Sequence, residues 1–351
     1  MQPVKVLIVD DSAVLRVTLK RLLEEDGDLQ VVGTAANGAQ ALAAIPRTAP
    51  DVVVLDVEMP VMDGLDTLRR IVAEYQCQVV MLSAHTRRGS EITVAALSYG
   101  AFDFVTKPES NLQVKTVAAE LVAKIKLAAA APRFVAIKTA AARKEARPEG
   151  RAAAVPQRGQ KVKAAVIGCS TGGPAALRLI LPRLPASLPF PVIVVQHMPV
   201  GFTGSLAHHL DVQCALKVVH AADGDDLEPG KVFVAPSGLD FLLRNEGNAV
   251  KVILKRREKP LPPGGFCPSV DDVMAEVAAV YGSGTLGVLL TGMGRDGARG
   301  MALIKAKGGR TIVQDRESSV VFGMPAAAIE AGAADKVVPL HEIAAEIIGE
   351  V

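Results

Sequence analysis

The chain has 351 residues, half of them hydrophobic, but only 3% are aromatic and none is tryptophan. This length exceeds what one hydrophobic core usually organises, so we expect two domains. The scarcity of aromatic side chains argues against a protein that stacks nucleic-acid bases, and the net charge of only +2 adds no support for one. Since every apolar run is shorter than the roughly 20 residues of a membrane span and no secretory signal is evident, we expect a cytoplasmic protein without direct membrane insertion.

The basic residues gather in one segment. Nine Lys or Arg but only two acidic residues lie between Ala128 and Lys163, together with alanine runs and prolines. This composition lacks strand or helix periodicity and predicts a flexible linker over residues 128–161. We therefore expect one domain over residues 1–127 and a second over residues 162–351. The four cysteines have no metal-ligand spacing, so neither a zinc site nor a disulfide framework is expected.

In the first domain, short runs rich in β-branched residues alternate with amphipathic helical stretches. Continuous apolar strands followed by such helices are typical of a parallel sheet covered on both faces. The pattern predicts a doubly wound α/β domain with five strands, at residues 4–10, 29–35, 51–57, 78–84 and 101–107.

Polar side chains end several of these strands, where the carboxyl ends of parallel strands form a crevice. Asp10 and Asp11 end the first strand, and Asp56 ends the third. Three carboxylates there would repel one another unless a divalent cation neutralised them, and Mg²⁺ takes one or two carboxylates, waters and a phosphate oxygen. Ser83 and Lys107 end the fourth and fifth strands and could contact phosphoryl oxygens. Each residue alone could be a solvated loop residue, but five at matching strand ends predict an aspartyl-phosphate site.

Residues 4–126 resemble the receiver domain of response regulators. The matching features are the Asp10-Asp11 pair, LDVEMPVMDG around Asp56, LSA with Ser83, and FVTKP. The resemblance implies a flavodoxin-like fold in which Asp56 is phosphorylated by a histidine kinase.

The same resemblance implies further roles within this domain. Mg²⁺ would be bound by two carboxylates and a backbone carbonyl, with a third carboxylate helping through water: Asp11, Asp56, Glu58 (carbonyl) and, through water, Asp10. Three residues would couple phosphorylation to a change at the surface: Ser83, Phe104 and Lys107. The peptide bond before Pro108 would be cis.

After the linker, strands and helices alternate again. We expect a larger, doubly wound and mainly parallel α/β domain, with strands at residues 162–169, 191–197, 216–221, 231–236, 285–291 and 310–315. Residues 240–256 predict a β-hairpin that turns at Glu246-Gly247-Asn248, the one antiparallel signal in this half.

A glycine-rich turn at Ser170 connects the first of these strands to a helix with Pro174 near its start. The string GCSTG satisfies the G-x-S-x-G pattern. Small residues let the backbone turn sharply and present the hydroxyl, and the N–H groups of a helix N-terminus support negative charge. The pattern alone is weak, and a phosphate-binding or nucleotide-binding turn is the rival interpretation.

Two further strand ends could complete a serine hydrolase site. His197 ends the next strand, so its imidazole could accept the proton of Ser170, although an isolated histidine there could be a simple surface residue. Asp296 follows a later strand in GMGRDGARG and could orient the imidazole; alternatively, it caps the next helix. Backbone N–H groups around Met293 could stabilise an oxyanion.

Residues 162–350 resemble the catalytic domain of chemotaxis protein-glutamate methylesterases. The matching motifs are IGCSTGGP, VVQHMPVGFT, APSG, PSVD, LLTGMGRDGARGM and VVFGMPAAAI. Receiver, linker and this domain together reproduce that family's architecture, and the chain order of the three site residues differs from that of α/β-hydrolases. The resemblance implies that Ser170 is the nucleophile, His197 the general base and acid, and Asp296 its orienting carboxylate. It also places the Met293 N–H in the oxyanion hole and implies no cofactor in this domain.

The function implied by the resemblance is phosphorylation-activated hydrolysis of glutamate γ-methyl esters, with deamidation of glutamines, on the cytoplasmic helices of chemoreceptors. The enzyme would be a monomer whose receiver covers the active site until it is phosphorylated. It would act in chemotaxis or a related chemosensory pathway.

Two places depart from the family pattern. Asp240 stands where many members have histidine, and Phe266-Cys267 stands where many have a His-Arg pair. These departures leave the choice of receptor open and give some support to an alternative, a non-enzymatic regulator that binds receptors in a phosphorylation-dependent way. A transcription factor has no support beyond the receiver and the basic linker, because no helix-turn-helix pattern accompanies them.

Overall fold

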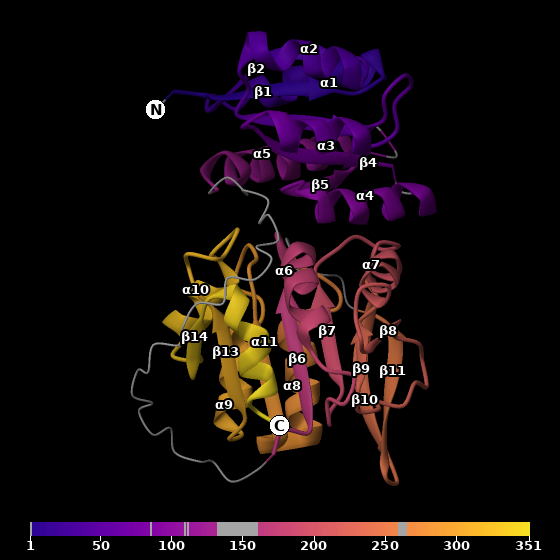
Figure 1. Ribbon diagram of the computed structural model, residues 1–351, viewed down its shortest axis with the longest axis vertical. Helices are drawn as coiled ribbons and strands as arrows, with labels where there is room; N and C mark the ends of the chain where they lie inside the picture. Colours follow the sequence, from indigo (N-terminus) through magenta and orange to yellow (C-terminus); the bar gives the residue numbers. More distant parts are fainter. Residues whose placement is uncertain (1, 85, 109, 111, 132–160, 259–264) are drawn as a thin grey trace.

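The structure is a computed structural model with two α/β domains, one above the other in Figure 1. It describes residues 2–131 and 161–351, except for 85, 109, 111 and 259–264. Most of the predicted linker therefore lies outside the described residues. Its first residues, 128–130, instead continue the last helix of the first domain.

The first domain is the predicted five-stranded parallel sheet, with strand order β2-β1-β3-β4-β5. Its strands are β1 Val4–Val9, β2 Leu29–Ala35, β3 Val52–Asp56, β4 Gln78–Ser83 and β5 Asp103–Thr106. Its helices are α1 Ala13–Glu24, α2 Gly38–Thr48, α3 Gly64–Glu74, α4 Arg87–Tyr99 and α5 Val114–Ala130. Apolar residues of α1 and α5 pack on one face and those of α2, α3 and α4 on the other, which is why the central strands are fully buried.

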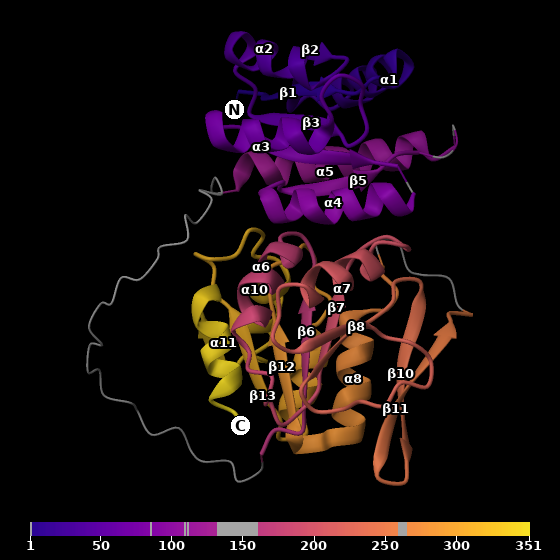
Figure 2. The same cartoon turned by 45° about the vertical axis from the view of Figure 1, so that its right-hand side comes forward.

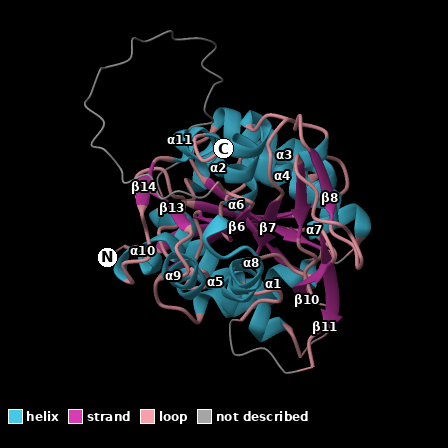
Figure 3. Cartoon of the chain, turned by 90° about the horizontal axis from the view of Figure 1, so that it is seen from below, coloured by secondary structure: helices cyan, strands magenta, loops and turns pink. Residues whose placement is uncertain are grey.

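The second domain is built on a seven-stranded parallel sheet with strand order β14-β13-β12-β6-β7-β9-β8. Its strands are β6 Ala164–Cys169, β7 Val192–Gln196, β8 Lys217–His220, β9 Lys231–Val234, β12 Thr285–Leu289, β13 Arg310–Gln314 and β14 Lys336–Val338. Its α-helices are α6 Gly173–Ile180, α7 Thr203–Asp211, α8 Val270–Tyr281, α9 Ala298–Ala306, α10 Met324–Glu330 and α11 Leu340–Ile348. Figure 3, which looks up from below, shows helices on both sides of the strands.

The predicted hairpin forms a separate two-stranded sheet of β10, Leu239–Glu246, and β11, Ala249–Arg256. The pairing of Glu246 with Ala249 confirms the turn predicted for this segment. The edge strand β14 was not predicted. The fold class expected from the sequence is otherwise confirmed in both domains.

Strand β6 is the point where the strand order reverses, because β7 continues on one side of it and β12 lies on the other. In an open parallel sheet, such a switch point leaves a crevice outside the carboxyl ends of the strands. The loops after β12, β6 and β7 therefore meet at one edge. These are the loops that carry the three predicted hydrolase residues.

The receiver rests on this edge of the catalytic domain through its α4 and β5. Figures 1 and 2 both show α4 directly above α6 and α7. Phe104 stacks on Phe202 with ring centroids 4.7 Å apart. Ser98 on α4 forms a 2.8 Å hydrogen bond with Nε2 of His209 on α7. The two domains therefore share one continuous hydrophobic core cluster.

The backbone departs from one prediction. The peptide bond before Pro108 is not cis; within the described residues the cis peptide bond is Cys267–Pro268. The trans and cis forms of a bond to proline differ by only about 0.5–1 kcal/mol, so packing rather than local sequence decides between them. In addition, none of the described helices combines the length and apolar character needed to cross a membrane.

Candidate active site

The turn between β6 and α6 is shaped by two glycines that cannot carry side chains. Gly172 has a φ of +79°, and a Cβ there would lie 2.7 Å from Cβ of Val320. A Cβ on Gly173 would lie 2.0 Å from Oε1 of Gln196. Ser170, at the start of this turn, is nearly buried at the carboxyl end of β6. The sharp strand-to-helix elbow predicted from the sequence is therefore present.

Gln196 joins the serine loop to the histidine loop. Its Nε2 donates to the carbonyl of Ser170 (3.0 Å) and to the carbonyl of His197 (2.9 Å). The backbone N–H of His197 also donates to the carbonyl of Cys169 at 3.0 Å. Gln196 was not predicted as a site residue; its only signal in the sequence is that a polar residue ends an otherwise apolar strand.

The carboxylate of Asp296 contacts the imidazole of His197 and the start of α8. His197 Nε2 lies 2.8 Å from Asp296 Oδ2. The same carboxylate accepts hydrogen bonds from the Ser269 hydroxyl (2.8 Å) and from the N–H groups of Val270 (2.8 Å) and Asp271 (2.9 Å). Burial alone would raise the pKa of Asp296, but these hydrogen bonds outweigh it and hold the pKa well below its usual range. The group therefore remains ionised beside the imidazole.

The alternative interpretation of Asp296, as a cap of the helix that follows it, is wrong. The residue before α9 is Gly297, which has no side chain to cap with. The carboxylate turns instead to the N-terminus of α8, where the positive end of the helix dipole also favours a negative charge. This role depends on the PSVD motif, which was not predicted to take part in the site.

In the predicted triad, His197 is hydrogen-bonded to Asp296 but not to Ser170. His197 Nδ1, the nitrogen not facing Asp296, is buried and has no hydrogen-bond partner within the described part of the chain. No hydrogen bond joins it to Ser170 in this structure, although the two residues follow adjacent strands whose ends are paired. Catalytic hydrogen bonds often tighten only when substrate is bound. The unpaired nitrogen is the atom that could accept the serine proton.

The loop after β12 brings a free N–H group next to the serine. A Cβ on Gly292 would lie 2.8 Å from Cβ of Ser170, so the backbone passes very close to this serine. The N–H of the next residue, Met293, donates to no other described residue. An unused backbone donor beside a serine is what an oxyanion requires.

In the receiver, the predicted acidic residues gather around Lys107. Its Nζ lies 2.8 Å from Oδ2 of both Asp10 and Asp56, which are buried, whereas Asp11 is exposed. Ligand atoms of the three carboxylates lie within 4.8 Å of one another. Burial raises the pKa of Asp56 to about 6, although Lys107 opposes the rise. An all-oxygen cluster whose negative charges are costly to bury could hold a hard divalent cation.

Of the other receiver residues singled out in the sequence, Glu58 lies beside Asp56, and Ser83 and Phe104 lead to the domain interface. The N–H of Glu58 donates to Asp56 Oδ1 at 3.3 Å. Ser83 is fully buried and accepts a 2.7 Å hydrogen bond from the hydroxyl of Thr93 on α4, the helix that lies on the catalytic domain. Phe104 reaches the interface directly through its stacking on Phe202.

A polar contact joins the receiver to the residue after the serine. The hydroxyl of Thr171 donates to Asp103 Oδ2 at 2.7 Å, and both residues are buried. Asp103 begins β5 and also lies 3.5 Å from the ammonium of Lys124. The receiver therefore contacts the turn that carries Ser170 in this structure.

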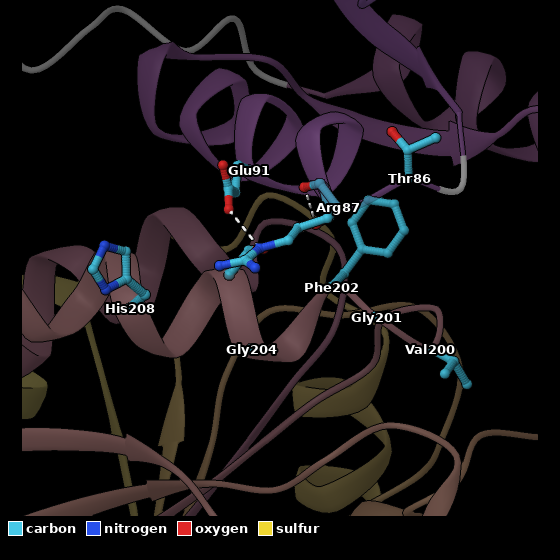
Figure 4. Close-up of a pocket in the computed structure, with 10 residues that line it drawn as sticks. Thr86, Arg87, Glu91, Val200, Gly201, Phe202, Gly204 and His208 are labelled. Atoms are coloured by element: carbon cyan, nitrogen blue, oxygen red, sulfur yellow. Dashed lines mark hydrogen bonds and ion pairs between the residues drawn. The ribbon is translucent and has the colours of Figure 1, made fainter.

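The interface is less tightly packed at its edge. A cavity of about 500 Å³ lies between the start of α4 and the start of α7, where Figure 4 shows Arg87 turned toward Glu91 of its own helix. Beside it, the hydroxyls of Ser90 and Ser205 meet at 2.9 Å. Interfaces between domains that move resemble transient protein interfaces, with polar contacts and incomplete packing.

Asp56→Asn is expected to stabilise the receiver by about 1–3 kcal/mol at pH 7. The pKa of Asp56 is raised in the folded state, to about 6, so the ionised carboxylate costs stability that grows as the pH rises from about 4 through 6 and persists above. Asparagine removes this cost. Urea unfolding between pH 4 and 8 should show a gain for the variant that is largest above pH 6; a loss of stability at pH 7 would contradict the prediction.

Two family models match the chain. The model for CheB methylesterase matches residues 165–347, and the model for the response regulator receiver domain matches residues 6–119. The chain belongs to the CheB methylesterase family. The order of its two domains also agrees with the family resemblance seen in the sequence.

Relatives of known name extend along nearly the whole chain. A protein-glutamate methylesterase/protein-glutamine glutaminase of Geobacillus kaustophilus is 46% identical over 353 residues, covering 99% of this chain and 99% of that protein. One of Symbiobacterium thermophilum is also 46% identical and covers 98% of this chain and 96% of that protein. The crystal structure of the Thermotoga maritima CheB methylesterase catalytic domain is 43% identical, with a TM-score of 0.52, and covers 55% of this chain and all of that one. These relatives confirm the predicted enzyme class and the fold of the catalytic domain.

Proposed function

We propose that this chain hydrolyses glutamate γ-methyl esters, and deamidates glutamines, on the cytoplasmic helices of chemoreceptors when Asp56 is phosphorylated. The observation that carries the proposal is the pairing of His197 with the ionised Asp296, while the other imidazole nitrogen stays buried and unpaired on a residue that follows the strand next to that of Ser170. A module that only binds receptors has no need of a buried carboxylate-imidazole pair. A cytoplasmic location follows from the proposed substrate.

In the proposed reaction, Ser170 Oγ attacks the carbonyl carbon of the ester, and Nδ1 of His197 takes the serine proton. The carbonyl oxygen becomes negative and accepts a hydrogen bond from the N–H of Met293. The imidazolium returns the proton to the departing methoxide, so methanol leaves and an acyl-serine remains. Asp296 holds the ring and stabilises its positive charge throughout.

Water completes the cycle. His197 accepts a proton from a water molecule, which attacks the acyl-serine carbonyl, and the serine hydroxyl re-forms as glutamate is released. With a glutamine side chain the same steps release ammonia in place of methanol. One set of residues therefore serves both reactions, and no cofactor is needed in this domain.

The receiver is proposed to be phosphorylated on Asp56 by a histidine kinase, with Mg²⁺ held by Asp10, Asp11, Asp56 and the carbonyl of Glu58. When bound, this cation supplies positive charge for the phosphoryl oxygens. Lys107 already lies beside Asp10 and Asp56 and provides a second positive group there.

Phosphorylation is proposed to loosen the interface through Ser83 and Phe104. A phosphoryl group on Asp56 competes for the Ser83 hydroxyl, which now accepts the hydrogen bond from Thr93 on α4. Because α4 and Phe104 both rest on the catalytic domain, their movement would release the contact over the nucleophile turn. Substrate then reaches Ser170.

Methanol release from methylated chemoreceptor tests the enzymatic proposal against the binding-only alternative. The full-length chain, treated with a small phosphodonor such as acetyl phosphate and Mg²⁺, should release methanol at a rate proportional to its concentration. Receptor binding without methanol release under these conditions would reject the hydrolase and favour the binding regulator.

The dependence on phosphorylation is a separate prediction. The phosphodonor should raise methanol release by the unaltered chain by about tenfold or more, the size of a typical coupling between two sites. Asp56→Asn should keep the low rate of the untreated chain, since it has no carboxylate to phosphorylate. Equal stimulation of both proteins would show that the donor acts elsewhere.

A further inference from the structure

A phenyl ring lies against the histidine of the site and has no part in the roles given above. Phe266 is in the short segment that precedes α8, and its ring stacks on the imidazole of His197. The ring centroids are 4.0 Å apart and the planes differ by 6°. We propose that Phe266 is a positioning residue that fixes the plane of the His197 ring, so that Nδ1 faces Ser170. This inference rests on the proposed function and adds to it a residue that acts through the general base.

The contact with Asp296 restrains only one edge of the imidazole. Rotation about the Cβ–Cγ bond of His197 moves Nδ1 more than Nε2, because Nε2 lies nearer the rotation axis. The hydrogen bond to Asp296 therefore leaves the direction of Nδ1 partly free. A flat ring packed in parallel over the imidazole opposes that rotation, since any tilt brings ring atoms together. Proton transfer requires such control, because catalytic groups must be held to within about 0.5 Å.

Phe266 also separates the imidazole from water. The side chain of His197 is 1% exposed, whereas Phe266 itself is 42% exposed. The phenyl ring is therefore the outer layer and the imidazole the inner one. Its face carries the negative part of the aromatic quadrupole, which is compatible with the imidazolium that forms during the reaction. A phenyl ring offers no hydrogen bond or titrating group. Its effect on His197 therefore comes from its shape and from the partial negative charge on its face.

The backbone on the C-terminal side of Phe266 is anchored at two points. The carbonyl of Cys267 accepts a hydrogen bond from the N–H of Gly238 at 2.7 Å. Ser269 donates to the carboxylate of Asp296 at 2.8 Å. The second anchor is the same carboxylate that holds His197, so the phenyl ring and the imidazole are positioned from a common point.

The departures from the family pattern meet at this segment. The Cys267 thiol lies 3.5 Å from Asp240 Oδ1, and Arg257 donates to the same oxygen at 2.7 Å and to Asp272 at 2.6 Å. Asp240 and Cys267 therefore belong to one connected group with the backbone that carries Phe266. The three residues that depart from the family pattern therefore lie together in the structure, and one of them stacks on His197.

Two variants of Phe266 test the proposal in the phosphorylated full-length chain, with methanol release from methylated chemoreceptor as the assay. Phe266→Leu keeps an apolar side chain but removes the flat ring, and is expected to lower kcat by about 10-fold to 100-fold with little change in KM. Phe266→Tyr keeps the ring, and its hydroxyl can reach solvent because the residue is partly exposed. It is expected to retain kcat within about threefold.

The outcomes separate this inference from the proposed function. If Phe266→Leu matches the unaltered chain in kcat, if Phe266→Tyr loses as much as Phe266→Leu, or if the whole effect lies in KM, the positioning role is overturned while the hydrolase stands. If the unaltered chain releases no methanol, the proposed function fails and this inference fails with it. Urea unfolding of both variants checks whether they are folded. If Phe266→Leu loses kcat because it is unfolded, Phe266 has a structural role and the proposal is wrong.

Discussion

Ser170→Ala is expected to lower kcat for methanol release by at least about 10⁴-fold, because it removes the atom that is proposed to form the acyl-enzyme. The receiver lies in a separate domain, so phosphorylation of Asp56 should proceed at the unaltered rate. Both quantities can be followed in one reaction, methanol by release from methylated receptor and phosphorylation by labelled phosphodonor.

Ser187→Ala is the matched control for this variant. Ser187 is exposed in the loop before β7, so its loss should leave both rates unchanged. Methanol release by Ser170→Ala at more than about a tenth of the unaltered rate would reject a serine mechanism. A simultaneous loss of phosphorylation would point instead to general misfolding.

Asp296→Asn is expected to lower kcat by about 10³-fold to 10⁴-fold. The neutral amide cannot stabilise the imidazolium that forms on His197, and its NH₂ group cannot accept the hydrogen bonds that the carboxylate now receives from the start of α8. Asp211→Asn is the control. Asp211 also accepts a side-chain hydrogen bond and a backbone N–H, at the end of α7, but has no contact with His197. Equal activity of the two variants would remove Asp296 from the mechanism.

The same substitution should reduce stability by about 2–4 kcal/mol at pH 7. The pKa of Asp296 is depressed in the folded state, so its ionised form contributes stability above the unfolded value of about 4, and this contribution is lost as the pH falls through the folded value. Urea unfolding from pH 7 down to pH 2 should therefore show a shallower acid loss for Asp296→Asn. If the free energy of unfolding falls in parallel with pH for Asp296→Asn and the unaltered chain, the depressed pKa assigned to Asp296 is contradicted.

Most strands of both sheets could be predicted because buried parallel strands have continuous apolar sequences. The edge strand β14 was not predicted, because its three residues are too few for a periodic pattern. The alanines at 128–130 were assigned to the linker by composition, yet alanine is the best helix former and α5 extends through them. Local composition therefore misplaced one boundary without changing the fold.

The site residues could be placed at strand ends, but their contacts could not. Gln196 joins the serine and histidine loops through its side-chain amide, and only the three-dimensional structure reveals that bond. Asp296 was expected either to orient the imidazole or to cap the helix that follows it; it contacts His197, and the helix whose start it binds is α8, earlier in the chain. Phe266 stood out only as a departure from the family pattern, because stacking on His197 leaves no periodic trace in sequence.

Ser170, His197 and Asp296 are proposed to act as one unit, and the rate of a double variant tests this most directly. Ser170→Ala, His197→Gln and the combined variant should be compared for methanol release in the phosphorylated chain, against receptor alone. If the hydroxyl and the imidazole act in the same step, the double variant should release methanol at the same residual rate as Ser170→Ala. If instead the double variant loses rate by the product of the two single-variant factors, Ser170 and His197 do not work together.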